Sequence, residues 1–529
     1  MGKLARKLAG MACLAGCLLG GVVTMARAAD LNIGFKAEVT SADPHVLNGA
    51  NRNVWGHVYD TLVEQDRQLR PTPGLAQSWR LVNPTTWEFT LRPNVKFHNG
   101  AALTADDVKY SIVRAMQLPG PRTFRSYLRD VDSVSVSVSA PLTLQVKTKR
   151  VSPTLPENLG LVAILPRSLG EHVGEDSFAS GKAAIGSGPY KFSSWLHGQK
   201  LVLTKNPDYW GAKQPWEHVT LQFIPREPAR AAALLSGSVD VINDVTANME
   251  AALKRYELVS VTSYMLNYLA LDQFRDRSPF VRAADGTPLA KNPLKDARVR
   301  QAMMTAINRD GIIRFLMKGD ATAAEQLVPK GFFGYENGFK LPAYDLAKAK
   351  ALLAEAGYPA GFQLTVHCTN NRYVNDARLC EAVAQVFSQI GIKTEVATMP
   401  YSVFQTRAFG GASGESEFSV FLVGNGAVTG DTLTALVSTI HSADKAAGTG
   451  ASNYGRYHNK EVDSLIDKAA ANTDEPARLR QQQQAARLAL GDGAIIPLLH
   501  LNASWAMKKQ LTMTPRADGF TMAMDIHPK

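Results

Sequence analysis

The chain has 529 residues, of which 45% are hydrophobic and 20% are charged. This length exceeds what one hydrophobic core supports and predicts roughly two or three lobes, and the composition excludes a disordered chain and a membrane bundle. The formal net charge is +11, but no long basic run accompanies it, so we expect no nucleic-acid partner.

Residues 1–28 are predicted to be a signal peptide. They begin with basic residues, continue with an apolar stretch and end in Ala26–Ala28, which offers small residues where a signal peptidase cleaves. We therefore expect a periplasmic protein that starts near Ala29. Leu14–Cys17 also resembles a lipobox, so the alternative is a protein anchored by a lipid on Cys17.

Cys368 and Cys380 are the cysteines outside the predicted signal peptide. Two cysteines twelve residues apart in a secreted protein are more often a disulfide than a metal site, because a metal would need further ligands at suitable spacing. The pattern favours a disulfide, and two buried free thiols are the alternative.

The stretch from residue 59 to residue 111 carries the densest local pattern. Apolar and polar side chains alternate in Thr86–Arg92, which predicts a half-buried strand. Val95–His98 keeps the alternation, and we expect it to pair with the first strand as a hairpin. Thr104 precedes two acidic residues and an apolar helical pattern, so it is predicted to be the N-cap of a helix.

Five blocks of this stretch resemble the family-5 extracellular solute-binding proteins, the peptide and nickel class of receptors that feed bacterial ABC importers. The blocks are Tyr59–Leu62, Pro73–Trp79, Trp87–Arg92, Val95–Gly100 and Leu103–Val108. The resemblance implies an α/β fold of the type II, or cluster C, periplasmic binding proteins, with two lobes joined by a two-segment hinge and an inserted subdomain. It also implies a monomer without enzymatic activity or cofactor. Such a receptor captures a small peptide or peptide-like solute and delivers it to a membrane permease and its ATPase.

Further landmarks of the resembling family set the expected boundaries. Ile185–Phe192 resembles the segment that returns the chain to the first lobe, and Tyr264–Asp272 and Ile495–Leu499 are the predicted crossings between lobes. We expect lobe I to comprise 29–51, 185–265 and 497–529, the inserted subdomain 52–184, and lobe II 266–496.

Helical and strand-like patterns alternate in the predicted lobe II. Asp296 and Asp345 are predicted helix N-caps, Leu364–Cys368 and Phe418–Val423 are predicted strands, and the apolar residues of 379–390 fit a helical period. This alternation favours a largely parallel sheet covered by helices.

The loop Asn370–Asp376 follows a predicted strand and precedes a predicted helix, the place where α/β sheets bind ligands. It resembles the Asn-Asp-Arg-Tyr-Val-Asn-Asp stretch of a peptide-type subgroup of the family. We predict that Asn371, Arg372 and Tyr373 bind the ligand, because an arginine can fork onto a carboxylate and a tyrosine can stack or donate a hydrogen bond. The alternatives are a structural ion pair for Arg372 and a helix cap for Asp376.

The strand end formed by Val423, Gly424, Asn425 and Gly426 is the second predicted contact. In peptide-binding relatives it commonly carries a Gly-Trp pair, followed by an aspartate that pairs with the peptide's ammonium group. Here the tryptophan is absent, Asn425 brings no charge, and the first downstream acid is Asp431. A free amino terminus would lose a charge-assisted hydrogen bond of about 1.5–3 kcal/mol unless Asp431 reaches it.

Two further segments complete the predicted site. Leu31–Phe35 is a predicted strand, and in the resembling family the loop that follows it borders the cleft. We therefore include Val46, Leu47 and Asn48 among the ligand-binding residues. Tyr268 is included because it lies on the first predicted crossing.

Other functions have less support from the residues. The sequence has no nucleophile elbow, zinc-protease, P-loop or dinucleotide motif, which disfavours a periplasmic hydrolase. Its eleven histidines are scattered without metal-ligand spacing, so no metal site is predicted. Within the same fold, the alternative is another cargo, such as nickel, a metal chelate, haem, an opine or a sugar derivative.

Overall fold

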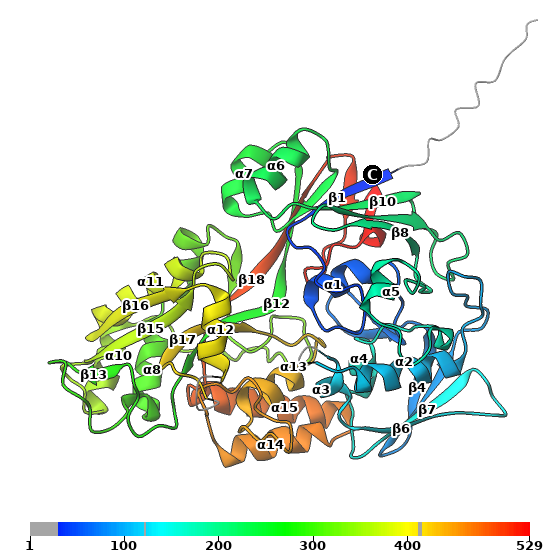
Figure 1. The fold of residues 1–529 in the computed structure, drawn as a ribbon. Helices are drawn as coiled ribbons and strands as arrows, with labels where there is room; N and C mark the ends of the chain where they lie inside the picture. Colours follow the sequence, from blue (N-terminus) through cyan, green and yellow to red (C-terminus); the bar gives the residue numbers. More distant parts are fainter. Residues whose placement is uncertain (1–29, 121–122, 411–414) are drawn as a thin grey trace, which may run out of the picture.

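The computed structural model describes residues 30–120, 123–410 and 415–529. The predicted signal peptide and the lipobox cysteine Cys17 lie outside the described residues. The described chain forms two halves joined by two long strands, β12 (Glu257–Leu271) and β18 (Ile496–Met507) (Figure 1). No helix in these ranges is long and apolar enough to cross a membrane.

The main sheet runs through both halves. Within the described residues it has twelve strands, ordered β13-β15-β17-β12-β18-β11-β1-β10-β9-β8, with β14 paired to β18 and β16 paired to β15. The bounds of the other ten strands are β1 (Asp30–Phe35), β8 (Tyr190–Leu196), β9 (Lys200–Lys205), β10 (His218–Phe223), β11 (Val241–Asn243), β13 (Val281–Ala283), β14 (Ala321–Ala323), β15 (Phe362–Thr369), β16 (Ile392–Met399) and β17 (Val420–Asn425).

The two long strands belong to both halves. β12 pairs antiparallel with β18 along most of its length, and the register is irregular between Thr262 and Leu266. On one side of this irregularity β18 also pairs with β11, and on the other side β17 pairs with β12 and β14 pairs with β18. We take the irregularity as the boundary between lobe I, with β1 and β8–β11, and lobe II, with β13–β17.

Lobe II has a parallel centre, since β15 is parallel to both β16 and β17, while β13 and β12 run antiparallel at its sides. Buried apolar residues cover both faces of this sheet. Asp296 and Asp345 cap α8 and α10 through their side chains, which confirms both predicted N-caps. The helices are α8 (Ala297–Ala306), α9 (Arg309–Gly311), α10 (Leu346–Glu355), α11 (Asp376–Gln389), α12 (Tyr401–Gly410), α13 (Thr432–Ala435), α14 (Lys460–Ala470) and α15 (Glu475–Gly491), with short turns η2 (Pro293–Lys295), η3 (Ile312–Leu316) and η4 (Leu436–Ile440).

The inserted subdomain has its own sheet and core. Its strands are ordered β4-β5-β7-β6, and Thr104 forms a capping box with Asp107 at the start of α2, which confirms the predicted N-cap. The elements are β2 (Val63–Gln65), β3 (Pro71–Pro73), β4 (Ala76–Asn83), β5 (Thr86–Leu91), β6 (Val131–Val136), β7 (Thr143–Thr148), α2 (Ala105–Gln117), α3 (Arg125–Leu128), α4 (Leu155–Leu159), η1 (Arg167–Leu169) and α5 (Glu175–Ala179).

The predicted hairpin between Thr86–Arg92 and Val95–His98 is wrong. β5 pairs instead with β4 on one side and β7 on the other, so both of its edges are occupied. Asn94 has a φ of 63°, which turns the chain away from β5, and the Phe97 N–H donates to the carbonyl of Ala101 at 2.8 Å. The alternating pattern identified buried side chains correctly but not their partner strand.

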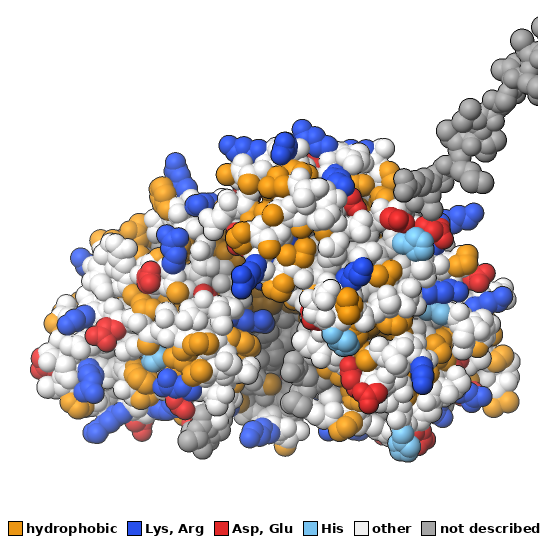
Figure 2. Space-filling model, turned by 45° about the horizontal axis from the view of Figure 1, so that its top comes forward, with side chains coloured by type: hydrophobic (Ala, Val, Ile, Leu, Met, Phe, Trp, Pro, Cys, Tyr) orange, Lys and Arg blue, Asp and Glu red, His pale blue; other side chains and the backbone are white. Residues whose placement is uncertain are grey.

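Lobe I is completed by helices beside the sheet and by the C-terminal segment. β1 runs parallel to β10 and β11, and α6 and α7 lie at the top of Figure 1. The remaining elements are α1 (Gly49–Trp55), α6 (Glu227–Leu235), α7 (Ala247–Leu253), β19 (Leu511–Met513), η5 (Ala523–Asp525) and β20 (Ile526–Pro528). The space-filling view shows the surface hollowed between the two halves (Figure 2).

Candidate ligand-binding site

Two predicted contacts of lobe II meet at the ends of neighbouring strands. β15 and β17 are parallel, so the loop 370–376 after β15 and the end of β17 lie at the same edge of the sheet. The backbone N–H of Gly424 donates to the Tyr373 hydroxyl at 2.9 Å. The structure therefore brings together two segments that are about fifty residues apart in the sequence.

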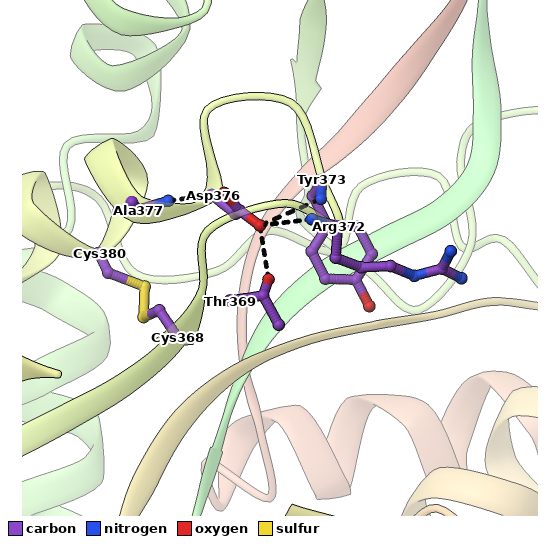
Figure 3. The surroundings of a disulfide bond; sticks show 7 residues. All are labelled: Cys368, Thr369, Arg372, Tyr373, Asp376, Ala377 and Cys380. Carbon is purple, nitrogen blue, oxygen red and sulfur yellow. Dashed lines mark hydrogen bonds between the residues drawn. A yellow bond between two sulfur atoms is a disulfide. The ribbon is translucent and has the colours of Figure 1, made fainter. Parts of the chain in front are cut away.

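The loop is built around the carboxylate of Asp376. This carboxylate accepts hydrogen bonds from the Thr369 hydroxyl at 2.5 Å and from the backbone N–H groups of Arg372 and Tyr373 at 2.9 and 3.2 Å (Figure 3). Asn375, with φ of 56°, is the N-cap of α11, so Asp376 organises the loop more than it caps the helix. The loop conformation is therefore fixed by one buried charge.

A disulfide joins β15 to α11 across the base of the same loop. It links Cys368 and Cys380, whose Cα atoms are 6.6 Å apart. Figure 3 shows the disulfide on one side of the loop and the side chains of Arg372 and Tyr373 on the opposite side. Closing the ends of a loop lowers the entropy lost when its tip is ordered around a ligand.

Gly424 and Gly426 are required by close packing against two tyrosines. A Cβ atom at Gly424 would lie 2.7 Å from the ring of Tyr373, and a Cβ atom at Gly426 would lie 2.2 Å from the backbone oxygen of Tyr264. Neither position has room for a side chain. The two tyrosines thus cover the backbone of the strand end, and the N–H groups of Gly424 and Gly426 donate within the protein.

Arg372 carries a charge that the protein does not neutralise locally. Its guanidinium lies 4.8 Å from the ring centre of Tyr401 and 5.7 Å from that of Tyr373. No carboxylate of the described residues lies within 4 Å of it, and the side chain is exposed. The structural ion pair considered from the sequence is therefore absent in the described part of the chain, and the guanidinium can bind a carboxylate bidentately.

Tyr264 lies where the two lobes meet. It occupies the irregular stretch of β12, and burial raises its pKa to about 12. The charges of Arg52 and Asp518 from lobe I and of Arg372 from lobe II all act on its hydroxyl. These groups therefore surround one point of the cleft.

Lobe I contributes a network of charged residues to this point. Arg52 donates to the Gln65 side chain at 3.2 Å and lies over the ring of Phe520. Arg516 pairs with the buried Asp518 at 2.8 Å. Sequence spacing did not identify these residues, because Arg52 and Asp518 come from opposite ends of the chain and carry no motif.

Asn371, Arg372 and Tyr373 also line a cavity between the lobes. The cavity has a volume of about 280 Å³ and is bordered on the lobe I side by Lys36 and by the start of α7. Three of the residues predicted from the loop therefore face space between the lobes.

The remaining predicted contacts of lobe II are engaged inside the protein. The Asn425 amide donates to the Thr439 hydroxyl at 2.9 Å. Val423 and Tyr268 are 2% and 1% exposed and belong to a buried cluster. Asp431 is 3% exposed and pairs with Arg478 at 2.8 Å, so its carboxylate is not available to an ammonium group at the strand end.

The lobe I loop residues serve three different purposes. Val46 lines a separate cavity of about 740 Å³ beside α2 and bridges to Thr123. Leu47 packs against the core of the inserted subdomain. Asn48 caps α1 by accepting from the Ala50 N–H at 2.8 Å. These contacts do not place the three residues beside Tyr264.

The described residues contain no group of three His, Cys, Asp or Glu side chains arranged to hold a metal ion. Burial lowers the pKa of His45, His57, His98, His367 and His500 to about 4. These histidines are therefore neutral residues of the protein interior at pH 7.

The geometry defines a class of protein, namely a two-lobe binding protein with a cleft between α/β lobes and two connecting strands. Residues 70–447 match the family model described as bacterial extracellular solute-binding proteins, family 5. This match covers more than half of the chain, and the protein belongs to that family.

Individual relatives agree with this assignment. The chain is 26% identical over 493 residues to the probable D,D-dipeptide-binding periplasmic protein DdpA of Escherichia coli, covering 89% of each chain. It is 27% identical to the glutathione-binding protein GsiB of Salmonella paratyphi A, covering 92% of this chain and 91% of GsiB.

Solved structures share the fold. HbpA2 from Haemophilus parasuis has a TM-score of 0.78 at 24% identity, covering 94% of this chain and 100% of HbpA2. The ABC transporter substrate-binding protein CtaP from Listeria monocytogenes has a TM-score of 0.80 at 21% identity, covering 95% and 99%. The α/β two-lobe fold predicted from the sequence is thereby confirmed.

Proposed function

We propose that this protein is the periplasmic receptor of an ABC importer and that it captures a small peptide or peptide-like solute between its lobes. DdpA and GsiB, which match most of the chain, are named for a dipeptide and for glutathione. The receptor binds its cargo unchanged, acts as a monomer and passes the cargo to a membrane permease driven by an ATPase.

The single observation that carries the peptide-like cargo is the exposed guanidinium of Arg372. It lies at the edge of the lobe II sheet, stacked on Tyr401, with no carboxylate of the described residues within 4 Å. A carboxylate of the cargo would gain a charge-assisted hydrogen bond worth about 1.5–3 kcal/mol there. The Tyr373 hydroxyl, which accepts from the Gly424 N–H, would donate a further hydrogen bond to the cargo.

Closure follows from the same arrangement. Arg372 belongs to lobe II, whereas Arg52 and Asp518 belong to lobe I, and a cargo that contacts both walls binds the closed form better than the open one. The closed form is then what the permease recognises.

Mass spectrometry of the denatured protein identifies any cargo that co-purifies with it. Calorimetric titration with a panel of dipeptides, tripeptides and glutathione then measures affinity, and small-angle scattering measures contraction on binding. Binding of a peptide-like molecule with contraction and no product supports the proposal. Chemical conversion of the cargo, or binding restricted to metals or haem, contradicts it.

Export is the remaining part of the proposal. A signal peptide of residues 1–28 with the mature protein starting near Ala29 accounts for delivery to the periplasm. N-terminal sequencing of protein recovered from the periplasm tests it. A blocked N-terminus at Cys17, with the protein in the membrane fraction, would instead support the lipid-anchored form.

A further inference from the structure

A small cavity lies between α1, β2 and the C-terminal segment, where lobe I meets the inserted subdomain. Its volume is about 190 Å³, and its apolar wall includes Trp55, Tyr59, Phe520 and Met522. This volume is below the roughly 300 Å³ at which whole-ligand sites begin, so it suits one group of a larger molecule. Methionine side chains adapt to an aliphatic stem, and aromatic rings attract a cation at their faces.

The charged residues of the cavity leave an excess of negative charge. Glu64, Asp518 and Asp525 line it together with Arg52 and Arg516. Asp518 is paired with Arg516 at 2.8 Å, and one oxygen of Glu64 accepts from the Thr61 N–H at 3.2 Å. Three carboxylates therefore face two guanidinium groups.

Asp525 is the carboxylate without a partner. Among residues 30–120, 123–410 and 415–529, no side chain or N–H group lies within hydrogen-bonding or ion-pairing distance of its carboxylate. Burial raises its pKa, and the charges of Arg516, Arg67 and His527 offset this effect only in part. A cation in the cavity would supply the remaining compensation.

A second polar group of the wall is also unsatisfied. Tyr59 is 4% exposed, and its hydroxyl has no hydrogen-bond partner in the described part of the chain. The charged residues that act on this hydroxyl are Asp43 and Arg114, which do not line the cavity.

Two charged residues of the cavity lie close enough to Tyr264 to act on its hydroxyl electrostatically. Arg52 and Asp518, which line the cavity, act on Tyr264, and Tyr264 lies directly against Gly426 of the strand end. The strand end itself offers only the neutral Asn425, because Asp431 is bound to Arg478. An ammonium group of the cargo therefore finds no free carboxylate at the strand end, whereas this cavity offers Asp525 and Glu64.

We propose, on the basis of the proposed function, that this cavity is a subsite for an ammonium group on a short apolar stem, either the amino end or a lysine-like side chain of the cargo. Asp525 and Glu64 bind the ammonium, and Trp55, Tyr59 and Met522 pack on the stem. With the carboxylate at Arg372, the cargo spans the two lobes as a zwitterion.

The first test needs no knowledge of the cargo. The probes are n-butylamine and n-butanol, which share the stem and differ in the charge, and binding is followed by ligand-observed NMR on the full protein. Binding of the amine alone, lost in Asp525→Asn and weakened in Glu64→Gln, is the expected result. Equal binding of both probes, or no binding of the amine, overturns the subsite.

The second test uses the dipeptides Ala-Lys and Lys-Ala against the same peptides with norleucine in place of lysine. We expect the wild type to prefer lysine by about tenfold or more, as one charge-assisted hydrogen bond provides, and Asp525→Asn to lose the preference. Glu395→Gln, which removes an exposed charge on β16, is the matched control and should keep it.

The two proposals fail in different ways. Tight binding of both lysine and norleucine peptides with equal affinity overturns the subsite and supports the peptide receptor. Binding of n-butylamine without binding of any peptide supports the subsite and contradicts peptide cargo. If Asp525→Asn lowers the melting temperature strongly, Glu64→Gln and Tyr59→Phe replace it, and unchanged lysine preference in both overturns the subsite.

Discussion

The two walls of the cleft differ in how their charged side chains are paired. On the lobe II wall, Asp376 holds the loop, Asp320 accepts from the Ala247 N–H, and Arg372 has no carboxylate of the described residues within 4 Å. On the lobe I wall, Arg52, Arg516 and Asp518 belong to one network beside the cavity that contains Asp525. The lobe II wall is therefore positive at Arg372, whereas the cavity beside lobe I holds three carboxylates and two guanidinium groups, so the proposed cargo would place its carboxylate at the first and its ammonium group at the second.

The largest expected loss of stability comes from disrupting the charged network of lobe I. Asp518→Asn leaves Arg516 and Arg52 without their nearest negative charge, and removing one partner of a buried ion pair costs about 3–5 kcal/mol. Chemical denaturation measures the loss. Asp276→Asn removes a partner of the surface pair with Lys295 and should leave stability unchanged. Equal effects of the two substitutions would show that the network is not a buried unit.

Removing the carboxylate of Asp376, which holds the lobe II loop, should lower the free energy of unfolding by somewhat less. Asp376→Ala leaves the Thr369 hydroxyl and the N–H groups of Arg372 and Tyr373 without their acceptor, which corresponds to roughly 2–3 kcal/mol. Because the loop also carries Arg372, we expect weaker cargo binding in addition. Unfolding and titration experiments on the same variant measure both losses, and unchanged affinity would separate the loop from the cleft.

Arg372→Gln should affect binding without affecting the fold. Its guanidinium has no ion-pair partner in the described residues, so we expect an unchanged melting temperature. Affinity for a cargo with a free carboxylate should fall about 10- to 100-fold, whereas the C-terminal amide of the same cargo should lose much less. A substitution at Arg80, whose partner Glu88 lies on the outer sheet of the inserted subdomain, is the matched control. Equal losses for acid and amide would contradict the positive wall.

The smallest net effect is expected from pH. Burial raises the pKa of Asp60 and of Glu157 to about 7, and each group binds its proton more tightly in the folded protein than in the unfolded chain. The cost of ionising them is therefore full above pH 7 and falls as the pH drops through 7 towards about 4, which is a stabilising contribution on acidification. The buried histidines with pKa values of about 4 contribute in the opposite direction below pH 6.5. The stability of the wild type should therefore rise on acidification relative to variants that lack either carboxyl group. Melting temperatures of wild type, Asp60→Asn and Glu157→Gln at pH 5.5 and 8 test this. A difference between wild type and both variants that is the same at the two pH values would contradict this assignment.

Local sequence patterns predicted local structure well. Thr104, Asp296 and Asp345 cap helices as expected, because a capping residue and its target N–H groups are neighbours in the chain. Val95–His98 was assigned to the wrong partner, because alternation shows which side chains are buried and does not show which strand lies beside them.

The candidate site was predictable only where it follows from the order of elements. The loop with Arg372 and the strand end with Gly424 meet because parallel strands end at one edge. Asp431 could not be assigned from the sequence, since its partner Arg478 lies 47 residues further along. Arg52, Tyr264 and Asp518 are brought together by the tertiary fold alone.

The link between Cys368 and Cys380 has a practical consequence for making this protein. Material produced in a reducing bacterial cytoplasm would carry two thiols there, and the tip with Arg372 would be held by hydrogen bonds alone, such as those of Asp376 and Tyr373. In such a preparation, ordering the loop in the conformation that faces the cleft would cost more entropy. The affinities measured for it would therefore be lower than those of the disulfide-bonded receptor.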